Sequence, residues 1–328
     1  MLFCRYCLLI AALIPMVVTA DGAAELDLFW ATTVESGHFA GVDNIEIAHV
    51  KAENRNARGL VVLSTGRTES YLKYREFIYQ LYLQGYSVYA FDHRGQGLSG
   101  RMLEDRLKGH VVDFGHYVGD FLTFLELEVE KSPIKKRFLV SHSVGGSIGI
   151  LAMAKRPDFF SAAVLNAPML EADLGVPGGC GIVSVVSWFC AECSTPRSSQ
   201  NSDEEAFKLN RLTHSAERFY QARKVFQQHP NAALSAPTYG WVEQACIVRN
   251  VQMQAAKKIK APLLLLQAGA DSVVHNAAQD RFCQQKRDLC DGNAPRVVAD
   301  AYHEIFFEED KYRDEGFAAM LDMFERHL

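Results

Sequence analysis

The sequence has no excess of positive charge, no internal repeat and no low-complexity segment. Lysine and arginine together number 34 against 39 aspartates and glutamates, which gives a formal net charge of −5. A chain of this charge lacks the basic surface with which proteins bind nucleic acids, so we expect no nucleic-acid partner. With 48% apolar and 22% charged residues, the 328-residue chain can form one large domain or a domain with an insertion.

The apolar run near the N-terminus, Cys7 to Val18, is shorter than the roughly 20 residues that a membrane-spanning helix requires. It follows the positive charge of Arg5 and ends in the small residues of Val18-Thr19-Ala20. This pattern is typical of a secretory signal peptide, so we predict that residues 1–20 are removed and that the protein is exported (periplasmic or secreted). An uncleaved N-terminal membrane anchor is the alternative. No cysteine follows the run, so lipidation is not indicated.

Metal-binding cysteine patterns are also lacking. Cys190 and Cys193 have a spacing found in redox and zinc sites, but no second cysteine or histidine pair stands at the distance that a zinc site requires, so we expect no metal. Without the first 20 residues the chain keeps six cysteines, at positions 180, 190, 193, 246, 283 and 290. An even number in an exported chain suggests disulfides, although the spacing leaves the pairing open and ordinary buried thiols are the alternative.

The sequence does not support a nucleotide-binding turn. Gly95, Gly97 and Gly100 follow an expected strand and match the glycine spacing of dinucleotide-binding proteins. Such a turn must open a helix with an apolar face, followed by a strand that ends in an acidic residue, and neither follows here. We therefore interpret this loop as a tight, glycine-dependent crossing beside the functional site, and we expect no cofactor.

The chain does contain a regular alternation of short apolar strands and helical segments. We expect an N-terminal antiparallel pair within residues 26–50. Further strands are expected directly before Ser141 and at residues 59–64, 86–91, 161–166, 262–267 and 296–299. Helices are expected directly after Ser143 and at residues 71–84, 114–129, 277–286 and 304–327. The alternation predicts an α/β fold, a mostly parallel sheet covered by helices on both faces, in one domain over residues 21–328.

The alternation breaks at about residues 168–260, where no strand is obvious. Helices are expected there near residues 206–212, 216–228 and 239–257, so we predict a helical lid inserted between two strands of the sheet. The apolar stretch from Ile182 to Phe189, which includes Trp188, would line an acyl channel or contact a membrane surface. A buried lid helix is the alternative interpretation of this stretch.

The stretch Ser141-His142-Ser143-Val144-Gly145 forms a small-residue turn between a strand and a helix. In a nucleophile elbow such a turn pushes one serine hydroxyl out of the sheet. The usual pattern is Gly-x-Ser-x-Gly, because larger side chains two residues from the nucleophile collide in the turn. Gly145 fits, and Ser141 replaces the first glycine with another small residue. We predict Ser143 as a nucleophile, although a serine-rich turn before a helix would show the same pattern.

A serine hydroxyl needs a base to take its proton and a third group to orient that base. In this architecture the order along the chain is serine, then an acid, then histidine, each in a loop after a strand. Ser143, Asp271 and His303 satisfy this order, and successive members are separated by 128 and 32 positions (271 − 143 and 303 − 271). We therefore predict a catalytic triad of these three residues.

Other residues compete for these roles. Asp92, Asp280 and Asp300 are alternatives to Asp271, which alone ends a strand with room for the turn to the histidine. His142 is a packed neighbour, because it cannot fold back onto the adjacent serine. For the oxyanion we expect two backbone N–H donors, from Val144 at the helix start and from Arg67 in the loop after the first long strand.

Several longer stretches resemble one group of proteins from about residue 60 to 310. They cover residues 66–71, 91–101, 141–146, 209–215, 237–242 and 301–305. The pattern Asp-x-Arg-Gly-x-Gly-x-Ser, from Asp92 to Ser99, marks the group most specifically. The chain resembles the lysophospholipase and monoacylglycerol-lipase branch of the α/β-hydrolases, and bacterial lysophospholipases in particular. The resemblance implies the α/β-hydrolase fold, the same triad, and Arg67 and Val144 as the oxyanion donors.

The expected function is that of a serine hydrolase that cleaves the carboxylic ester of a single-chain lipid, most simply a lysophospholipid. A monoacylglycerol lipase, a general carboxylesterase and a proline-type aminopeptidase are alternatives on the same fold. A catalytically silent lipid-binding protein is the alternative from another class, although an intact set of Ser143, Asp271 and His303 argues against it.

Overall fold

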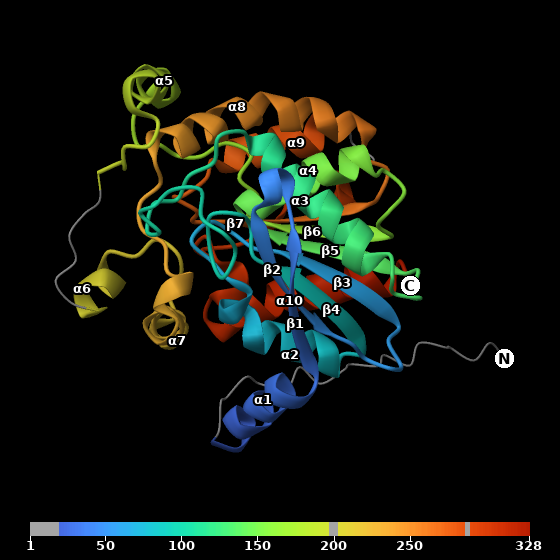
Figure 1. Ribbon diagram of the computed structural model, residues 1–328. Helices are drawn as coiled ribbons and strands as arrows, with labels where there is room; N and C mark the ends of the chain where they lie inside the picture. The colour runs from blue at the N-terminus through green and yellow to red at the C-terminus, as the bar shows by residue number, and fades with distance from the viewer. Residues whose placement is uncertain (1–19, 197–202, 286–288) are drawn as a thin grey trace.

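The computed structural model describes residues 20–196, 203–285 and 289–328, which are organised around one eight-stranded sheet (Figure 1). The strands lie in the order β1-β2-β4-β3-β5-β6-β7-β8. Their bounds are β1 Val34–Ala40, β2 Glu46–Ala52, β3 Gly59–Ser64, β4 Tyr86–Phe91, β5 Arg137–His142, β6 Ala162–Asn166, β7 Leu263–Ala268 and β8 Arg296–Val298. Only the pairs β1–β2 and β2–β4 are antiparallel, and the other neighbours are parallel. The predicted mostly parallel sheet is confirmed.

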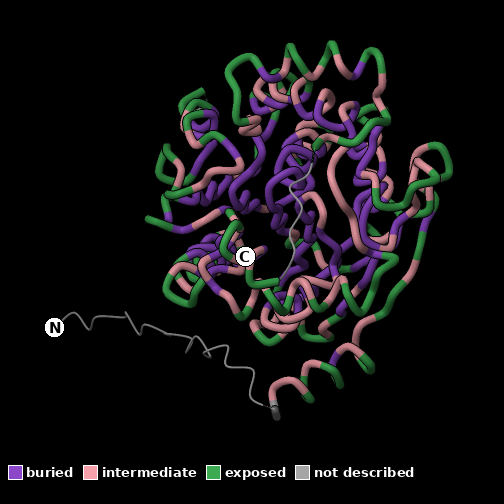
Figure 2. Tube along the Cα trace, turned by 90° about the vertical axis from the view of Figure 1, so that its left-hand side faces the viewer, coloured by how far each residue is buried: buried purple, intermediate pink, exposed green. Residues whose placement is uncertain are grey.

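Helices cover both faces of the sheet, because the side chains of a strand point alternately to opposite sides. Leu60 and Val62 of β3 pack in the core beneath one set of helices, whereas Val61 and Leu63 pack in the core beneath the other. The first set contains α3 Phe114–Phe124, α4 Val144–Lys155, α8 Tyr239–Ala255 and α9 Asn276–Gln285. The second set contains α1 Ala20–Thr32, α2 Arg75–Leu83 and α10 Asp310–Glu325. Figure 2 shows the buried residues in the interior of the molecule and the exposed ones at its rim.

Some predicted elements differ at their ends. Residues 26–32 were expected to be extended but belong to α1, whose Phe29 packs on the rings of Tyr79 and Tyr82 at 4.8 and 4.9 Å between centroids. The predicted helix over residues 304–327 is interrupted at Glu308, where a short 3₁₀ turn ends before α10 begins. The predicted signal peptide lies, apart from its last residue, outside the described residues, as does the end of the predicted helix over 277–286.

The insertion between β6 and β7 is helical where the structure describes it. It contains α8 and the helices α5 Gly179–Cys190, α6 Asp203–Lys208 and α7 Ala216–Gln228. The predicted helix over residues 206–212 begins and ends earlier, because Asn210 Oδ1 accepts hydrogen bonds from the N–H groups of Leu212 and Thr213 and so forms a turn. α5 is largely exposed, since only Gly179 and Ser187 are buried, and its interpretation as a buried helix is wrong.

Three disulfides resolve the cysteine pairing. Cys180–Cys246 ties α5 to α8, Cys190–Cys193 closes the end of α5, and Cys283–Cys290 ties the last turn of α9 to the segment before β8. All six of these cysteines are therefore bonded, and none is a buried thiol. Within the described ranges, no helix combines the length and apolar character needed to cross a membrane.

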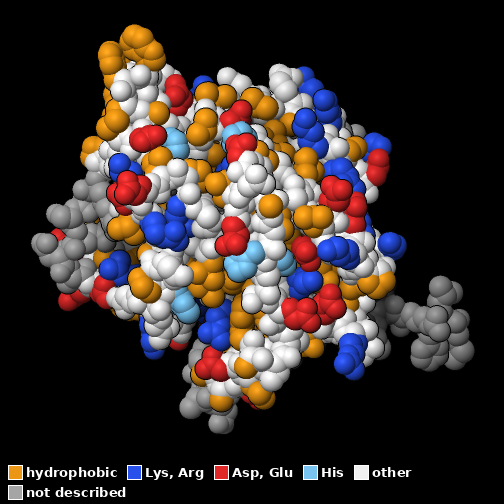
Figure 3. Space-filling view, in the orientation of Figure 1, with side chains coloured by type: hydrophobic (Ala, Val, Ile, Leu, Met, Phe, Trp, Pro, Cys, Tyr) orange, Lys and Arg blue, Asp and Glu red, His pale blue; other side chains and the backbone are white. Residues whose placement is uncertain are grey.

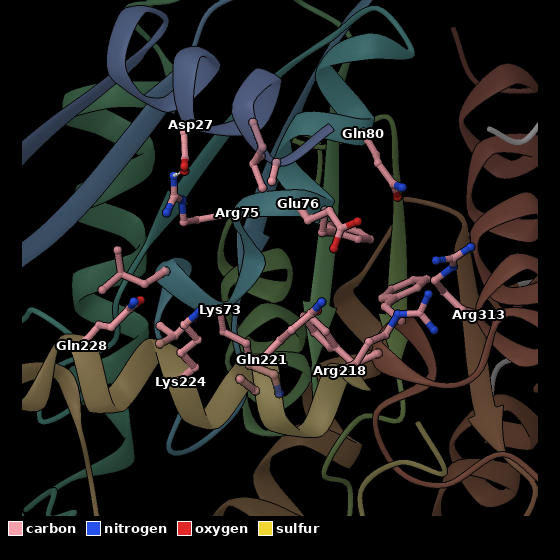
Figure 4. A pocket seen from close by; sticks show the side chains of 18 of the residues that line it. Asp27, Lys73, Arg75, Glu76, Gln80, Arg218, Gln221, Lys224, Gln228 and Arg313 are labelled. Atoms are coloured by element: carbon pink, nitrogen blue, oxygen red, sulfur yellow. Dashed lines mark hydrogen bonds and ion pairs between the residues drawn. The ribbon is translucent and has the colours of Figure 1, made fainter. Parts of the chain in front are cut away.

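Helix α7 has no buried residue. On one side it faces α1, α2 and α10 across a cavity of about 330 Å³, into which α7 directs Arg218, Gln221, Lys224 and Gln228 (Figure 4). On its other side Phe219, Arg223 and Phe226 line a second cavity, of about 490 Å³, beside the loop after β3. α7 is therefore a wall between two cavities.

Candidate active site

Ser143 occupies the sharp turn between β5 and α4. Its backbone lies at φ 51° and ψ −118°, a strained conformation for a residue with a side chain. Gly145 is required because a Cβ at that position would lie 2.3 Å from the carbonyl oxygen of Ser64 and 2.4 Å from that of Thr65. Ser141 replaces the first glycine of the usual pattern but is fully buried, with its hydroxyl near the carbonyl oxygen of Val164. The turn thus accommodates a serine there.

The structure brings Ser143, His303 and Asp271 into direct contact. Ser143 Oγ lies 2.9 Å from His303 Nε2, and His303 Nδ1 lies 2.7 Å from Asp271 Oδ2. The three residues follow β5, β8 and β7, so they meet at the carboxyl edge of the sheet. Asp271 Oδ1 accepts hydrogen bonds from the N–H groups of Val273 and Val274, which fixes the carboxylate toward the imidazole.

The ionisation of Asp271 suits His303 to act as a base. Burial alone would raise the pKa of Asp271, but the hydrogen bond to His303 and the N–H groups of Val273 and Val274 outweigh it and lower the pKa. An ionised Asp271 holds the imidazole proton on Nδ1 and leaves Nε2 free to accept the proton of Ser143.

The rival residues lie elsewhere. Asp92 accepts hydrogen bonds from Ser70 and from two backbone N–H groups and orders the glycine-rich loop. Asp280 accepts a hydrogen bond from Gln267, and Asp300 is exposed. His142 is buried, its Nδ1 donates to the carbonyl oxygen of Asn166, and its ring packs on that of His303 at 4.8 Å between centroids. It is a neighbour of the site, as predicted.

The loop after β3 is held rigidly beside the elbow. Glu69 accepts a hydrogen bond from the N–H of Gly66 at 2.5 Å, and Gln96 Nε2 donates to the carbonyl oxygens of Gly66 and Glu69. This loop carries Arg67, and Val144 is the first residue of α4, whose N–H has no acceptor within the helix. Arg67 and Val144, the two residues predicted to donate to the oxyanion, thus lie in the loop after β3 and at the first position of α4.

A buried charge cluster next to His303 was not predicted. Lys73 Nζ lies 2.7 Å from Glu69 Oε1 and 2.6 Å from Glu304 Oε1, and all three side chains are at least nine-tenths buried. Tyr74 also donates to Glu69. Burial raises the pKa of Glu304, although the ammonium group of Lys73 opposes this shift. The sequence did carry a signal for this cluster: Glu304 directly follows His303, and Glu69 stands three positions after Gly66.

The two carboxylates and His142 lie close enough to one another to ligate a metal ion. Lys73 supplies the positive charge between the carboxylates, and Glu69 already accepts hydrogen bonds from Gly66 and Tyr74. The cluster therefore fits a structural role that ties the loop of Arg67 to the loop of His303.

This sheet, with serine, acid and histidine in that order after β5, β7 and β8 and a helical insertion before β7, defines an α/β-hydrolase with a serine nucleophile. Comparison with known families agrees with this class. The chain belongs to the serine aminopeptidase S33 family, whose model matches residues 55–310.

Relatives are similar over most of their length. The lysophospholipase L2 of Escherichia coli K12 is 35% identical over 309 residues, which cover 91% of this chain and 89% of that protein. A monoacylglycerol lipase of Mycolicibacterium smegmatis is 27% identical over 287 residues, 86% of this chain and 94% of that one. The solved structure of a soluble variant of monoglyceride lipase from Saccharomyces cerevisiae superposes with a TM-score of 0.69 at 19% identity, over 90% of this chain and 97% of that chain. The last comparison concerns the fold alone.

Proposed function

We propose that this protein is a lysophospholipase, which hydrolyses the carboxylic ester of a single-chain lipid. The observation that carries the proposal is the 2.9 Å contact between Ser143 Oγ and His303 Nε2, because it supplies a base to an otherwise unreactive hydroxyl. The Escherichia coli relative, a lysophospholipase by name, supports this substrate class.

In the first half of the reaction, Ser143 Oγ attacks the carbonyl carbon of the ester while His303 Nε2 takes its proton. The N–H groups of Arg67 and Val144 receive the oxyanion. When the tetrahedral intermediate collapses, the ester C–O bond breaks and His303 gives its proton to the leaving alcohol oxygen, which leaves the acyl group on Ser143.

In the second half, His303 takes a proton from water and the resulting hydroxide attacks the acyl carbon. Ser143 Oγ leaves and recovers the proton from His303, and a free fatty acid is released. Asp271 stays ionised throughout and stabilises the imidazolium that forms in each half.

The test is a panel of substrates with the wild type and Ser143→Ala. We expect hydrolysis of palmitoyl lysophosphatidylcholine, and a loss of roughly 10⁴-fold or more in Ser143→Ala without a change in melting temperature. A fluorophosphonate probe should label the wild type at Ser143 and leave the variant unlabelled. Hydrolysis confined to monopalmitoylglycerol, to a short-chain ester or to a proline anilide would instead identify one of the alternatives, and full activity of Ser143→Ala would refute the mechanism.

The insertion serves as a lid whose α5 contacts a membrane surface. Trp188 and Phe189 are 83% and 77% exposed, and Val176, Ile182 and Val185 are exposed beside them. Hydrophobic side chains gather at this tip of the molecule, at the upper left of Figure 3. Apolar patches of this kind mark interaction sites, and a lipid substrate resides in such a surface. The disulfides at both ends of α5 support a rigid contact.

The protein is exported, with cleavage after Ala20. Three disulfides support this location, because disulfides form and persist in oxidising compartments. Cell fractionation followed by N-terminal sequencing tests it: a chain that begins at Asp21 in the soluble exported fraction is expected. An intact N-terminus in the membrane fraction would favour the anchor, and a cytoplasmic protein with reduced thiols would refute export.

A further inference from the structure

The cavity of about 490 Å³ lies beside the loop after β3 and is lined by Glu304, the neighbour of His303. His303 delivers its proton to the alcohol oxygen that departs, so the alcohol and its headgroup must lie next to this histidine. The cavity wall includes Glu304, which follows His303, and the loop of Arg67, together with α7 of the insertion. We propose that this cavity binds the glycerophosphate headgroup of a lysophospholipid, with the guanidinium groups of Arg67 and Arg223 around the phosphodiester. The proposal rests on the proposed lysophospholipase function.

Arg67 brings a guanidinium to one wall of the cavity. Its side chain lies over the ring of Trp241, at 5.2 Å from the centroid, and Nη1 donates to the carbonyl oxygen of Ser235 at 3.3 Å. These contacts hold the group in one place on the insertion side of the loop. A planar guanidinium held in this way matches the geometry of a phosphate, to which it can donate two parallel hydrogen bonds.

Arg223 brings a second guanidinium, from α7. Its Nε and Nη2 both donate to Asp203 Oδ1, at 2.8 and 2.6 Å, and its side chain is 36% exposed. A guanidinium has five N–H donors, so Asp203 engages only part of its capacity. Arg223 can therefore donate to a phosphate oxygen while it keeps its ion pair.

The charged side chains that line the cavity carry one net positive charge. Five charged side chains line it, of which Arg67, Lys73 and Arg223 are cationic and Glu69 and Glu304 are acidic. Lys73 lies between the two carboxylates and compensates one of their two charges, and the two guanidinium groups outweigh the other; Asp203, the partner of Arg223, does not line the cavity. A phosphodiester carries one negative charge and fits this balance, and the glycerol hydroxyl has Glu304 as an acceptor.

The cavity on the other side of α7 does not offer the same site, because neither Arg67 nor Glu304 lines it. Three of the arginines that line it bind carboxylates: Arg75 binds Asp27 (Figure 4), Arg218 binds Asp310 and Arg313 binds Asp314. Lys224 points into that cavity from the same helix as Arg223. It is a matched control, because its removal changes the charge of α7 on the opposite face.

The test compares two substrates with the same acyl chain, palmitoyl lysophosphatidylcholine and monopalmitoylglycerol. We expect Arg223→Gln to lower the ratio of their kcat/KM values by about tenfold, because only the first substrate carries the phosphate. Lys224→Gln should keep the wild-type ratio within about twofold. Asp203→Asn, which removes the competing carboxylate, should leave the ratio equal to or higher than that of the wild type. An unchanged ratio in Arg223→Gln, or an equal fall in Lys224→Gln, would overturn the proposal.

A second measurement separates the headgroup site from the choice of substrate. Glycerophosphocholine should inhibit hydrolysis of monopalmitoylglycerol competitively, and Arg223→Gln should raise its inhibition constant about tenfold. If the wild type hydrolyses only monopalmitoylglycerol, the lysophospholipase function is refuted. Inhibition by glycerophosphocholine then still tests whether the cavity binds the headgroup. Absence of inhibition, or the same inhibition constant in Arg223→Gln, refutes the site.

Discussion

Glu308 accepts a hydrogen bond from His214, at 2.7 Å between Oε1 and Nδ1, and so joins the helical insertion to the loop that carries His303. Glu308 is completely buried. Its carboxylate also accepts hydrogen bonds from the backbone N–H groups of Tyr302, His214 and Glu309, each at 2.9 Å. One acidic side chain thus fixes the catalytic histidine's loop against the base of the insertion.

Replacement of Glu308 by glutamine should weaken both the fold and the catalysis. The amide can no longer accept at both oxygens, so buried donors lose their partner and the free energy of unfolding should fall by about 3 kcal/mol. The loop of His303 then loosens, and kcat should fall about tenfold. Glu309→Gln, at an exposed neighbour, is the control and should match the wild type in urea denaturation and in activity. Equal behaviour of the two variants would contradict this role.

Asp271→Asn should remove most of the activity while the fold persists. The asparagine oxygen can still accept from Val273 and Val274, but its NH₂ group then faces His303 Nδ1 and favours the tautomer with the proton on Nε2. That nitrogen can no longer accept the proton of Ser143, so kcat/KM should fall by about 10⁴-fold. Asp280→Asn is the control. Activity within tenfold of the wild type in Asp271→Asn would contradict the assignment.

Stability should fall as the pH is lowered from about 6.5 to about 4. Burial lowers the pKa of His142 to about 4, so in this range the unfolded chain binds a proton that the folded protein does not. The contribution of His142 to the free energy of unfolding is fully present above the pKa of this histidine in the unfolded chain. It is lost as the pH falls toward the pKa of His142 in the folded protein, and the free energy of unfolding then changes by up to about 1.4 kcal/mol per pH unit. Urea midpoints at several pH values measure this slope.

His142→Asn should reduce that slope, because the titrating group is removed. His93, whose pKa burial also lowers to about 4, gives a second variant, His93→Asn, which should reduce the slope in the same direction. A slope that both variants leave unchanged would show that other groups control the acid sensitivity.

The disulfides should contribute to stability in the order of the lengths of the loops that they close, with the longest loop contributing most. Cys180–Cys246 spans 66 residues and Cys190–Cys193 spans 3. From loop entropy, the first stabilises by about 4 kcal/mol and the second by about 2 kcal/mol or less. The paired serine substitution at positions 180 and 246 should therefore lower the melting temperature more than the pair at positions 190 and 193. The reverse order would contradict the entropic explanation.

Binding to vesicles should depend on the exposed end of α5. The double variant Trp188→Ser, Phe189→Ser removes two large apolar side chains from this surface, and binding to phosphatidylcholine vesicles should weaken at least about tenfold. Hydrolysis of a water-soluble short-chain ester should not change. Leu83→Ser, at an exposed leucine of α2, is the control. Unchanged sedimentation of the double variant with vesicles would refute the membrane contact.

The central strands and the three site residues could be predicted because each has a strong local signal. β3 and β4 are apolar runs that end in loops, and their observed bounds equal the predicted ones. Ser143, Asp271 and His303 stand in the loops that follow β5, β7 and β8, and parallel strands bring such positions to one edge of the sheet.

The remaining features depend on contacts between distant parts of the chain. Lys73, Glu69 and Glu304 have the sequence pattern of solvated loop charges, and only the fold buries them together. The pairing of Cys180 with Cys246 likewise depends on how α5 packs on α8. Residues 26–32 formed a helix because the rings of α2 cover Phe29, which a pattern within one segment cannot reveal.

The bond between Cys180 and Cys246 determines how this protein responds to proteases. It encloses most of the insertion, including α6 and α7, in a single covalent ring. One cut anywhere between these two cysteines therefore yields two fragments that still migrate as one species until a reductant is added. A nicked molecule has Ser143 on one fragment and both Asp271 and His303 on the other, and the disulfide keeps the two fragments covalently linked.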